Sequence, residues 1–377
     1  MNNPQPKQIL VLTSSRADFG IYLPLLKKLK LDPLFDLKIL AFGSHLSKYH
    51  GYTIEQIKDA GFNVDYEIST FLTDDKPVDI STSFGLTSLK FSDFWNNNQN
   101  FDWVIVLGDR YEMAAATLSG VPFGVKFAHI SGGETTLGAF DNLYRHTIAL
   151  ASKLHFVSLN EFKKRIDQLL LYTEYESHIV GALSLDNLAE ITLLTIDEFY
   201  TKWRIDLSKD SILITIHPET ISFEKNKEFS NEVFNALTTI GSSKQLIVTM
   251  PNADTSGSLY REMFLNLKSS LPQNIHLIEN FGTQSYFTCM KYCRLLIGNT
   301  SSGITEAASF QKHVLNLGDR QKGRPTGGNV ISIPFNSQLI IDNSNKYLDK
   351  IFEGNNIYFN GSTANNIVQV LKNNKFD

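Results

Sequence analysis

The stretch Trp103-Val-Ile-Val-Leu107-Gly-Asp-Arg110 decides the fold class, together with a segment of helical spacing at 112–119 and a second β-branched run at 125–129. Short runs of branched aliphatic residues are typical of buried strands, and apolar residues spaced three and four apart are typical of a helix. A strand, a helix and a second strand in this order form a right-handed unit with parallel strands. The stretch therefore predicts an α/β fold.

The same alternation extends to both sides of this stretch. Predicted strands lie at 9–13, 37–41 and 154–157, and again after a polar stretch at 212–216, 245–249, 275–278, 295–297 and 314–316. Predicted helices lie at 22–30, 54–60, 81–97, 147–152, 303–310 and 363–372. We expect two Rossmann-like, doubly wound domains facing a cleft: residues 1–180 with the C-terminal helix 362–377, and residues 181–361. Open α/β sheets bind ligands beyond the carboxyl ends of their strands, so functional motifs should follow strands.

Composition excludes several classes of protein. The chain has 377 residues, which is too long for one ordinary core. A net charge of −4 argues against non-specific binding to nucleic acid. The N-terminus lacks a signal-peptide pattern and the apolar runs are too short to span a bilayer, so we expect a cytoplasmic protein without membrane contact. The two cysteines, Cys289 and Cys293, suit neither a disulfide framework nor a common zinc site, and we expect no metal and no cofactor.

Three acidic residues of the first half gather near predicted strand ends. Asp109 follows one strand, Glu134 ends the string His129-Ile-Ser-Gly-Gly-Glu134, and Asp141 follows shortly after. Burial at a strand end would raise a carboxyl pKa toward neutrality, and paired carboxylates suit acid–base chemistry on a sugar. The alternative is that these residues are helix caps or turn residues. The spacing of Asp141 and Arg145 is also that of a helix salt bridge.

Two further strings suit an anionic ligand. Arg16 lies in the turn after the first strand, where an arginine can bind a phosphate or instead form a capping or interdomain salt bridge. The string Gly298-Asn-Thr-Ser-Ser-Gly-Ile-Thr-Glu306 directs several amides and hydroxyls toward one point at a helix start, which suits a diphosphate. The alternative is an ordinary cap by Ser301 or Ser302 that Glu306 completes.

The second half carries three weaker signals. His217-Pro218 ends a predicted strand, although a single histidine is more often structural than catalytic. The loop 318–328 supplies Arg320, Lys322 and Arg324, as a phosphate clamp or as a solvated basic loop. Asn252 lies in a polar turn that could bind a ribose or base, or only start a helix.

Taken in order, these strings resemble the hydrolysing UDP-N-acetylglucosamine 2-epimerases, which bacteria use for sialic-acid-type sugars and which form one half of an animal bifunctional enzyme. The resemblance covers nearly the whole chain. It rests on residues 15–18, 43–46, 108–110, 129–134, 138–146, 217–218, 251–252, 298–306 and 318–324.

The resemblance implies a fold like that of B-type glycosyltransferases, a UDP-sugar substrate and a homodimer or homotetramer. It implies elimination of UDP to a 2-acetamidoglucal, and addition of water to give N-acetylmannosamine and UDP. The catalytic residues that it implies are Asp109, Glu134, Asp141 and His217. The implied nucleotide or diphosphate contacts are Arg16, Asn252, Phe281, Ser301, Ser302, Gly303 and Glu306. The implied cationic or supporting groups are His45, Arg110, Arg145, His146, Arg320 and Arg324.

Departures from the family pattern keep other functions open. Ser131 and residues 142–144 differ from the usual pattern, so the substrate could carry 2,4-diacetamido-2,4,6-trideoxyglucose, the legionaminic acid type of sugar, on UDP or GDP. The non-hydrolysing branch usually carries Thr-Arg-Pro-Glu where this chain has Ser15-Arg-Ala-Asp18, and it lacks the Gly-Gly-Glu string. A B-type glycosyltransferase would need an acceptor, and a non-catalytic sensor would have no use for the three carboxylates.

Overall fold

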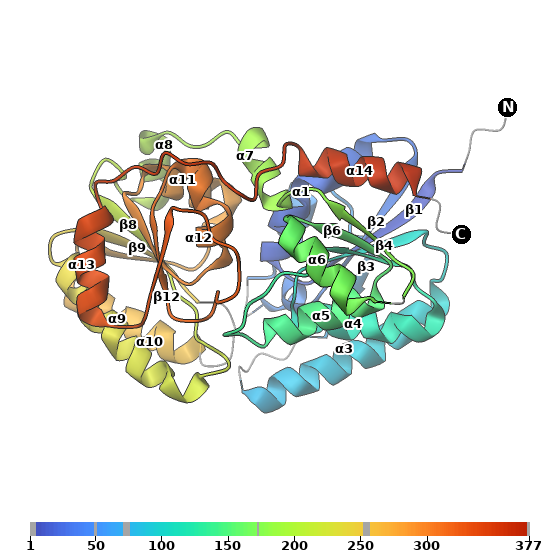
Figure 1. Ribbon diagram of the computed structural model, residues 1–377, viewed down its shortest axis with the longest axis horizontal. Helices are drawn as coiled ribbons and strands as arrows, with labels where there is room; N and C mark the ends of the chain where they lie inside the picture. Colours follow the sequence, from blue (N-terminus) through green and yellow to red (C-terminus); the bar gives the residue numbers. More distant parts are fainter. Residues whose placement is uncertain (1–4, 49–50, 71–75, 172, 252–256, 375–377) are drawn as a thin grey trace. The chain divides into compact units, whose positions relative to one another are not determined.

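The computed structural model describes residues 5–48, 51–70, 76–171, 173–251 and 257–374. The chain divides into two compact units. Unit 1 comprises residues 1–134, 141–190 and 358–377, and unit 2 comprises residues 135–140 and 191–357. Each unit is built on one parallel sheet with helices on both faces (Figure 1). The predicted α/β class with two doubly wound sheets is confirmed.

The sheet of unit 1 has the strand order β3-β2-β1-β4-β5-β6-β7. Its strands are β1 (Lys7–Thr13), β2 (Phe35–Phe42), β3 (Tyr66–Ile68), β4 (Trp103–Leu107), β5 (Phe127–Ile130), β6 (Leu154–Val157) and β7 (Glu176–Ile179). Its helices are α1 (Arg16–Leu31), α2 (Ile54–Asp59), α3 (Pro77–Asn97), α4 (Tyr111–Gly120), α5 (Asp141–Ala151), α6 (Asn160–Leu169), α7 (Asp186–Glu190) and α14 (Thr363–Asn373). The edge strands β3 and β7 were not predicted, because they are short and lack a buried apolar run.

The sheet of unit 2 has the order β10-β9-β8-β11-β12-β13. Its strands are β8 (Ser211–Thr215), β9 (Gln245–Thr249), β10 (Ile275–Ile278), β11 (Leu295–Gly298), β12 (Val314–Leu317) and β13 (Val330–Ile333). Its helices are α8 (Ile196–Trp203), α9 (Asn226–Gly241), α10 (Gly257–Ser270), α11 (Gly282–Tyr292), α12 (Ser301–Thr305) and α13 (Ser337–Tyr347). The helix predicted at 303–310 is wrong in its bounds, since α12 ends at Thr305 and a 3-10 turn, η6 (Ala307–Phe310), follows it.

Strand order reverses once in each sheet, and these points place the site motifs. In unit 1 the reversal lies between β1 and β4, so the turns that carry Arg16 and Asp109 are neighbours. In unit 2 it lies between β8 and β11, so the turns that carry His217 and Ser301 are neighbours. Such reversals open a crevice at the carboxyl edge of a sheet, which is where open α/β folds bind ligands.

The borders of the units differ from the expected ones. Unit 1 continues past residue 180 to Glu190, because Asp186 accepts hydrogen bonds from the backbone amides of Thr363 (3.0 Å) and Ala364 (2.6 Å) at the start of α14. The helix α14, red in Figure 1, packs on α1 and buries Ile367 and Leu371 in the core of unit 1. Residues 135–140 belong to unit 2, which the sequence did not predict.

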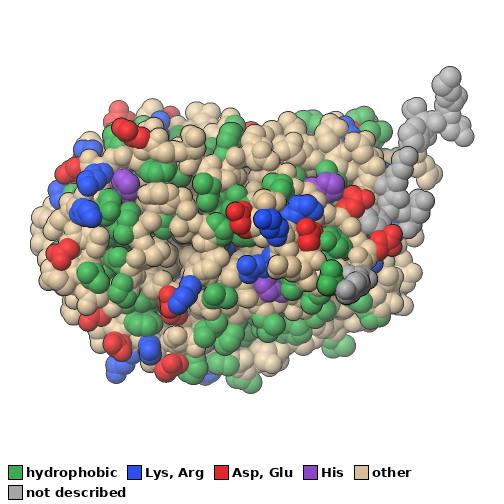
Figure 2. Space-filling model, in the orientation of Figure 1, with side chains coloured by type: hydrophobic (Ala, Val, Ile, Leu, Met, Phe, Trp, Pro, Cys, Tyr) green, Lys and Arg blue, Asp and Glu red, His purple; other side chains and the backbone are tan. Residues whose placement is uncertain are grey.

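The face of the molecule drawn in Figure 2 carries charges of both signs. On the face drawn in Figure 2, Lys and Arg side chains lie among Asp and Glu side chains. Within the residues that the structure describes, no helix combines the length and the apolar character needed to cross a membrane.

Cys289 and Cys293 are buried thiols, and burial raises the pKa of Cys293 to about 12.

Candidate functional site

In unit 1, Arg145 brings two of the predicted acidic positions together. Its side chain is 1% exposed, and its Nη2 donates to the carboxylate of Asp109. Its Nη1 donates to the backbone carbonyl of Glu134 at 3.2 Å. The Arg145 guanidinium thus joins the turn after β4 to the turn after β5. These two strands are neighbours in the sheet. A planar fork with several donors suits this double contact.

The structure corrects the expected environment of Asp109. The sequence suggested a deeply buried acid, but the Asp109 side chain is 29% exposed and pairs with a guanidinium. Solvent and a neighbouring cation both favour the ionised carboxylate. Glu134 is the more enclosed of the two residues, at 9% exposure. Asp141 is half-buried as the first residue of α5, one turn before Arg145.

A buried histidine holds the turn that carries Asp109. His129, on β5, donates from Nε2 to the carbonyl of Gly108 at 2.9 Å. Burial lowers the pKa of His129 to about 4, although the bond to Gly108 raises it, so the ring is neutral near pH 7. The two glycines after β5 also have a packing reason, since a Cβ at Gly132 would lie 2.9 Å from His129 Nδ1, and one at Gly133 would lie 2.3 Å from the Phe162 carbonyl.

Two other residues expected as cationic groups in unit 1 have different surroundings. Arg110 pairs with the buried carboxylate of Glu112 (3.0 Å), which lies in the first turn of α4. His146 is half-buried, and burial together with Arg145 and Arg165 lowers its pKa to about 4. His146 is therefore neutral near pH 7, which leaves it the supporting role of the two that the resemblance implied, because neighbouring guanidinium groups disfavour a further positive charge.

The turn after β1 is held by a buried network beneath Arg16. Ser15 and Asp18 form a capping box at the start of α1, and Asp18 also accepts the amide of Ser14 at 2.8 Å. His45 is fully buried, with Nε2 2.9 Å from Thr13 Oγ1 and Nδ1 2.9 Å from the hydroxyl of Thr53. His45 thus holds the end of β1 through its contact with Thr13. Arg16 is the first residue of α1 and is half-buried.

In unit 2, Asn299 fixes the backbone of His217. Its side-chain Oδ1 accepts the His217 amide at 2.8 Å, and its Nδ2 donates to the His217 carbonyl, also at 2.8 Å. The Asn299 backbone carbonyl accepts bonds from Arg320 Nη1 (3.3 Å) and Gln321 Nε2 (2.9 Å). Asn299 therefore joins the turns that follow β8, β11 and β12.

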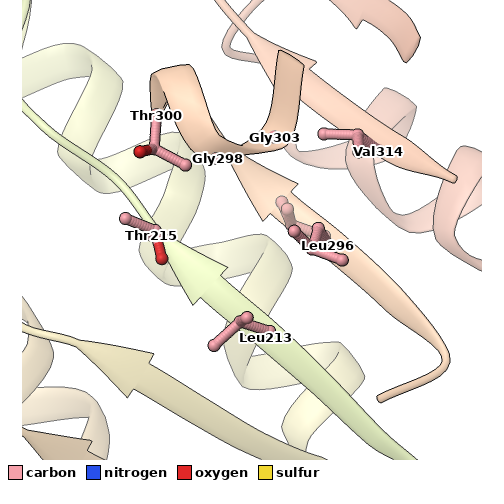
Figure 3. A pocket seen from close by; sticks show the side chains of 8 residues that line it. Leu213, Thr215, Leu296, Gly298, Thr300, Gly303 and Val314 are labelled. Atoms are coloured by element: carbon pink, nitrogen blue, oxygen red, sulfur yellow. The ribbon is translucent and has the colours of Figure 1, made fainter. Parts of the chain in front are cut away.

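The Gly298–Glu306 string forms a tight turn into α12. The cap is Thr300, whose hydroxyl accepts the Ser302 amide at 3.4 Å, so the alternative of an ordinary cap by Ser301 or Ser302 is wrong. Ser301 is exposed, whereas Glu306 is buried at the end of α12. Beneath the turn lies a small pocket with room for about one water, lined by Thr215, Leu296 and neighbouring residues (Figure 3). It is too small for a nucleotide.

The remaining predicted residues fall into three groups. Arg324 is buried, and Lys322 is exposed and pairs with Asp319 at 3.2 Å. The ring of Phe281 packs against Trp203 with ring centroids 4.9 Å apart, so the Phe281 side chain belongs to the core. A contact between Phe281 and a nucleotide would therefore come from its backbone. Asn252 lies outside the described residues.

Sequence reasoning missed two side chains that organise the site of unit 2. Asn299 lay inside a string noted for its serines, and Glu219 followed His217-Pro218 without a role of its own. Asn299 is fully buried and Glu219 is 3% exposed. An asparagine between a strand-ending glycine and a capping threonine is the signal that could have indicated Asn299, because a buried amide needs two partners.

Comparisons with known proteins agree with this architecture. The family model of UDP-N-acetylglucosamine 2-epimerase matches residues 27–372. The polysialic acid biosynthesis protein P7 of Escherichia coli is 31% identical over 97% of this chain and 94% of its own length. The GDP/UDP-N,N'-diacetylbacillosamine 2-epimerase (hydrolyzing) of Campylobacter jejuni is 32% identical over 92% of this chain and 87% of its own. The UDP-N,N'-diacetylbacillosamine 2-epimerase (hydrolyzing) of Legionella pneumophila is 31% identical over 97% and 96%.

Solved structures show the same fold at lower sequence identity. The crystal structure of UDP-GlcNAc 2-epimerase from Neisseria meningitidis bound to UDP-GlcNAc superposes with a TM-score of 0.80 at 18% identity, covering 97% of this chain and all of that one. From the family match over residues 27–372 and three relatives at 31–32% identity over most of the chain, the protein is an enzyme of the UDP-N-acetylglucosamine 2-epimerase family.

Proposed function

We propose that the enzyme is a hydrolysing 2-epimerase, which converts UDP-N-acetylglucosamine and water into N-acetylmannosamine and UDP. The observation that carries this proposal is the identity of 31–32%, over most of the chain, to two relatives named as hydrolysing 2-epimerases. The joining of Asp109 to the Glu134 turn by Arg145 supports it, because the reaction needs two acid–base groups.

The proposed reaction has two steps. A carboxylate removes the proton from C2 of the sugar, the electron pair forms a C1–C2 double bond, and UDP leaves with the electrons of the C1–O bond. Water then adds to the glucal, with its oxygen bonded to C1 and a proton delivered to C2 from the opposite side. The net result is hydrolysis at C1 and inversion at C2.

We assign the acid–base work to unit 1. Asp109 pairs with Arg145 and Glu134 is the more enclosed of the two, and we assign to this pair the removal and the return of the C2 proton. Asp141, at the start of α5, is kept as the third candidate. His129 contributes by holding the Gly108 carbonyl and with it the backbone that carries Asp109.

We assign most contacts to the leaving group to unit 2, and one, Arg16, to unit 1. Negative charge develops on the departing phosphate, so hydrogen-bond donors and cations aimed at it stabilise the transition state. Arg320 and the backbone of His217 are both held by Asn299, and Ser301 and Ser302 begin the adjacent helix α12. With Arg16, Gly303 and Glu306, these residues form the proposed nucleotide and diphosphate contacts.

A second substrate is favoured by a specific observation. Both relatives named as hydrolysing enzymes are named for N,N'-diacetylbacillosamine nucleotides, and the sugar of those nucleotides carries a second acetamido group. In this chain Ser131 adopts a positive φ of 66°, and Tyr144 packs beside Tyr111 with ring centroids 6.4 Å apart. These departures from the family pattern lie close to Glu134 and Asp141 in sequence. The 2,4-diacetamido-trideoxy sugar on UDP or GDP is therefore the second candidate.

The deciding experiment is an incubation in deuterated water without any acceptor, followed by NMR. Hydrolysing epimerisation gives free UDP and N-acetylmannosamine with deuterium at C2. Appearance of UDP-N-acetylmannosamine would contradict hydrolysis. Turnover of the diacetamido nucleotide alone, with UDP-N-acetylglucosamine inert, would select the second substrate. If no sugar nucleotide reacts although UDP binds, a non-catalytic sensor explains the protein better.

A matched variant ties the reaction to the proposed residues. Glu134→Gln keeps the size and the backbone contact to Arg145 but removes the ionisable carboxyl group. We expect loss of turnover with UDP affinity changed by less than about threefold, since half a kilocalorie or so is the usual scatter of a neutral substitution. Light scattering of the same samples tests the homodimer or homotetramer that we propose from the family resemblance. A cytoplasmic location, proposed from the sequence, is tested separately by cell fractionation.

A further inference from the structure

Glu219 is a buried carboxyl group that the proposed reaction leaves unused. It follows His217-Pro218 after β8 and is 3% exposed. Burial raises the pKa of Glu219, while bonds to the backbone of Asp319 and Arg320 and the charge of Arg320 lower it. A buried charged group is costly unless it is hydrogen-bonded, so these bonds account for its presence.

The carboxylate of Glu219 holds the turn that carries Arg320. Its Oε1 accepts the Asp319 amide at 2.5 Å, and the Arg320 amide also bonds to it. Gly318 starts this turn with a φ of +70°, and a Cβ there would lie 2.3 Å from Glu219 Oε1. The turn that carries Arg320 therefore packs directly against the Glu219 carboxylate.

Glu219 is itself held rigidly. The side chain of Asn226, the first residue of α9, accepts the Glu219 amide at 3.1 Å and donates to the Glu219 carbonyl at 2.8 Å. Asn226 is buried, and Tyr260 also bonds to its Oδ1 at 3.4 Å. Because the backbone of Glu219 is fixed in this way and its side chain is buried, the carboxylate can set the position of the groups that bond to it.

The next residue, Thr220, holds a second part of the chain. Its hydroxyl accepts the amide of Phe140 at 3.0 Å. Phe140 ends the segment 135–140, which also donates from the Leu137 amide to the Lys322 carbonyl at 2.9 Å. This segment directly joins Glu134 to Asp141 in the sequence. Glu219 thus holds the turn that carries Arg320. The adjacent residue, Thr220, holds the segment 135–140, which connects Glu134 to Asp141.

We propose that Glu219 and Thr220 are positioning residues: Glu219 places Arg320 for the diphosphate, and Thr220 places the segment that connects Glu134 to Asp141. Neither side chain needs to touch the substrate. The inference rests on the proposed function, and UDP affinity provides a measurement that does not require turnover.

The test compares four variants by calorimetry with UDP and by steady-state kinetics with the sugar nucleotide that the wild type turns over. Glu219→Ala removes the acceptor, and we expect UDP affinity to fall about tenfold, the usual effect of a lost hydrogen bond to a charged group. Glu219→Gln keeps an acceptor oxygen and should remain within about threefold of the wild type. Thr220→Val should lower kcat about tenfold at unchanged UDP affinity. Thr239→Val, on the exposed side of α9, is the control.

Several outcomes would overturn the inference. If Glu219→Ala binds UDP as the wild type does, the carboxylate does not place Arg320. The same follows if Glu219→Gln and Glu219→Ala lose equal UDP affinity. If both variants bind UDP more tightly, Glu219 acts only as a repulsive charge. A Thr220→Val variant with a lowered melting temperature and a normal kcat would make that residue merely structural. If the wild type neither binds UDP nor turns over any sugar nucleotide, the proposed function itself fails.

Discussion

At the scale of single residues, several polar side chains of the site act on backbone groups. Asn299 holds the backbone of His217, His129 holds the carbonyl of Gly108, and Arg145 holds that of Glu134. Turns at the ends of parallel strands have few backbone partners of their own. Side chains of this kind therefore determine where the reactive groups lie.

Arg145 offers the sharpest test at this scale. Arg145→Lys keeps the charge but loses the planar fork that reaches both Asp109 and the Glu134 carbonyl. We expect kcat to fall by about 100-fold, with UDP affinity little changed, because small displacements of acid–base groups cost about this much. Steady-state kinetics and UDP calorimetry measure the two effects. Arg294→Lys, an exposed ion pair with Asp210, serves as control, and equal losses in both variants would contradict the role of Arg145.

At the scale of elements, the two ends of α14 are attached to unit 1 by long-range polar contacts. Asp186 accepts two amides at its N-terminus. Lys7 donates to three carbonyls at its C-terminus, those of Leu371, Lys372 and Asn374. Between them Ile367, Val368 and Leu371 are buried. Caps of this kind satisfy the backbone groups that a helix leaves unpaired at its ends.

Removing the cap should loosen unit 1. Asp186→Ala leaves the Thr363 and Ala364 amides without their acceptor, and we expect a loss of about 1–2 kcal/mol of unfolding free energy. Asp186→Asn should lose less, because one acceptor oxygen remains. Denaturant unfolding followed by tryptophan fluorescence measures the change. Asp349→Ala, exposed in unit 2, should leave stability within about 0.5 kcal/mol, and a similar loss there would count against the capping role.

At the scale of the whole molecule, buried histidines make the stability of unit 1 depend on pH. His129 and His155, both in unit 1, are fully buried, and burial lowers their pKa values to about 4 and about 3. In an unfolded chain a histidine has a pKa of about 6.5. Between these values the unfolded state binds more protons than the folded state. The stability that these residues contribute is therefore present above about pH 6.5 and is lost as the pH falls toward about 4.

This linkage can be measured on unit 1 alone. Trp95 and Trp103 lie in unit 1 and Trp203 in unit 2, so a Trp203→Phe background reports the unfolding of unit 1 by fluorescence. We expect each buried histidine to remove about 1–3 kcal/mol between about pH 6.5 and pH 4. His155→Phe keeps a buried ring without a proton site, and it should flatten the pH dependence. An unchanged slope in that variant would contradict the linkage.

The sequence by itself determined the repeating strand–helix pattern, both parallel sheets and the strand ends where the site motifs lie. It could do so because buried parallel strands need apolar runs and because ligands bind at the carboxyl ends of those strands. The short edge strands β3, β7 and β13 escaped prediction because edge strands need no continuous buried apolar run. The sequence did not show that Thr300 is the cap of α12, because serine and threonine can both adopt the backbone angles of a cap.

Only the tertiary structure decided which polar groups meet. The helical spacing indicated Asp141 as a partner of Arg145, and it gave no sign that Arg145 binds Asp109, which lies 36 residues away along the chain. Asn299, Glu219 and Thr220 acquire their functions from partners in other turns. The physical reason is that local spacing fixes the direction of a side chain within its own element, whereas its partner is set by which strands lie next to each other.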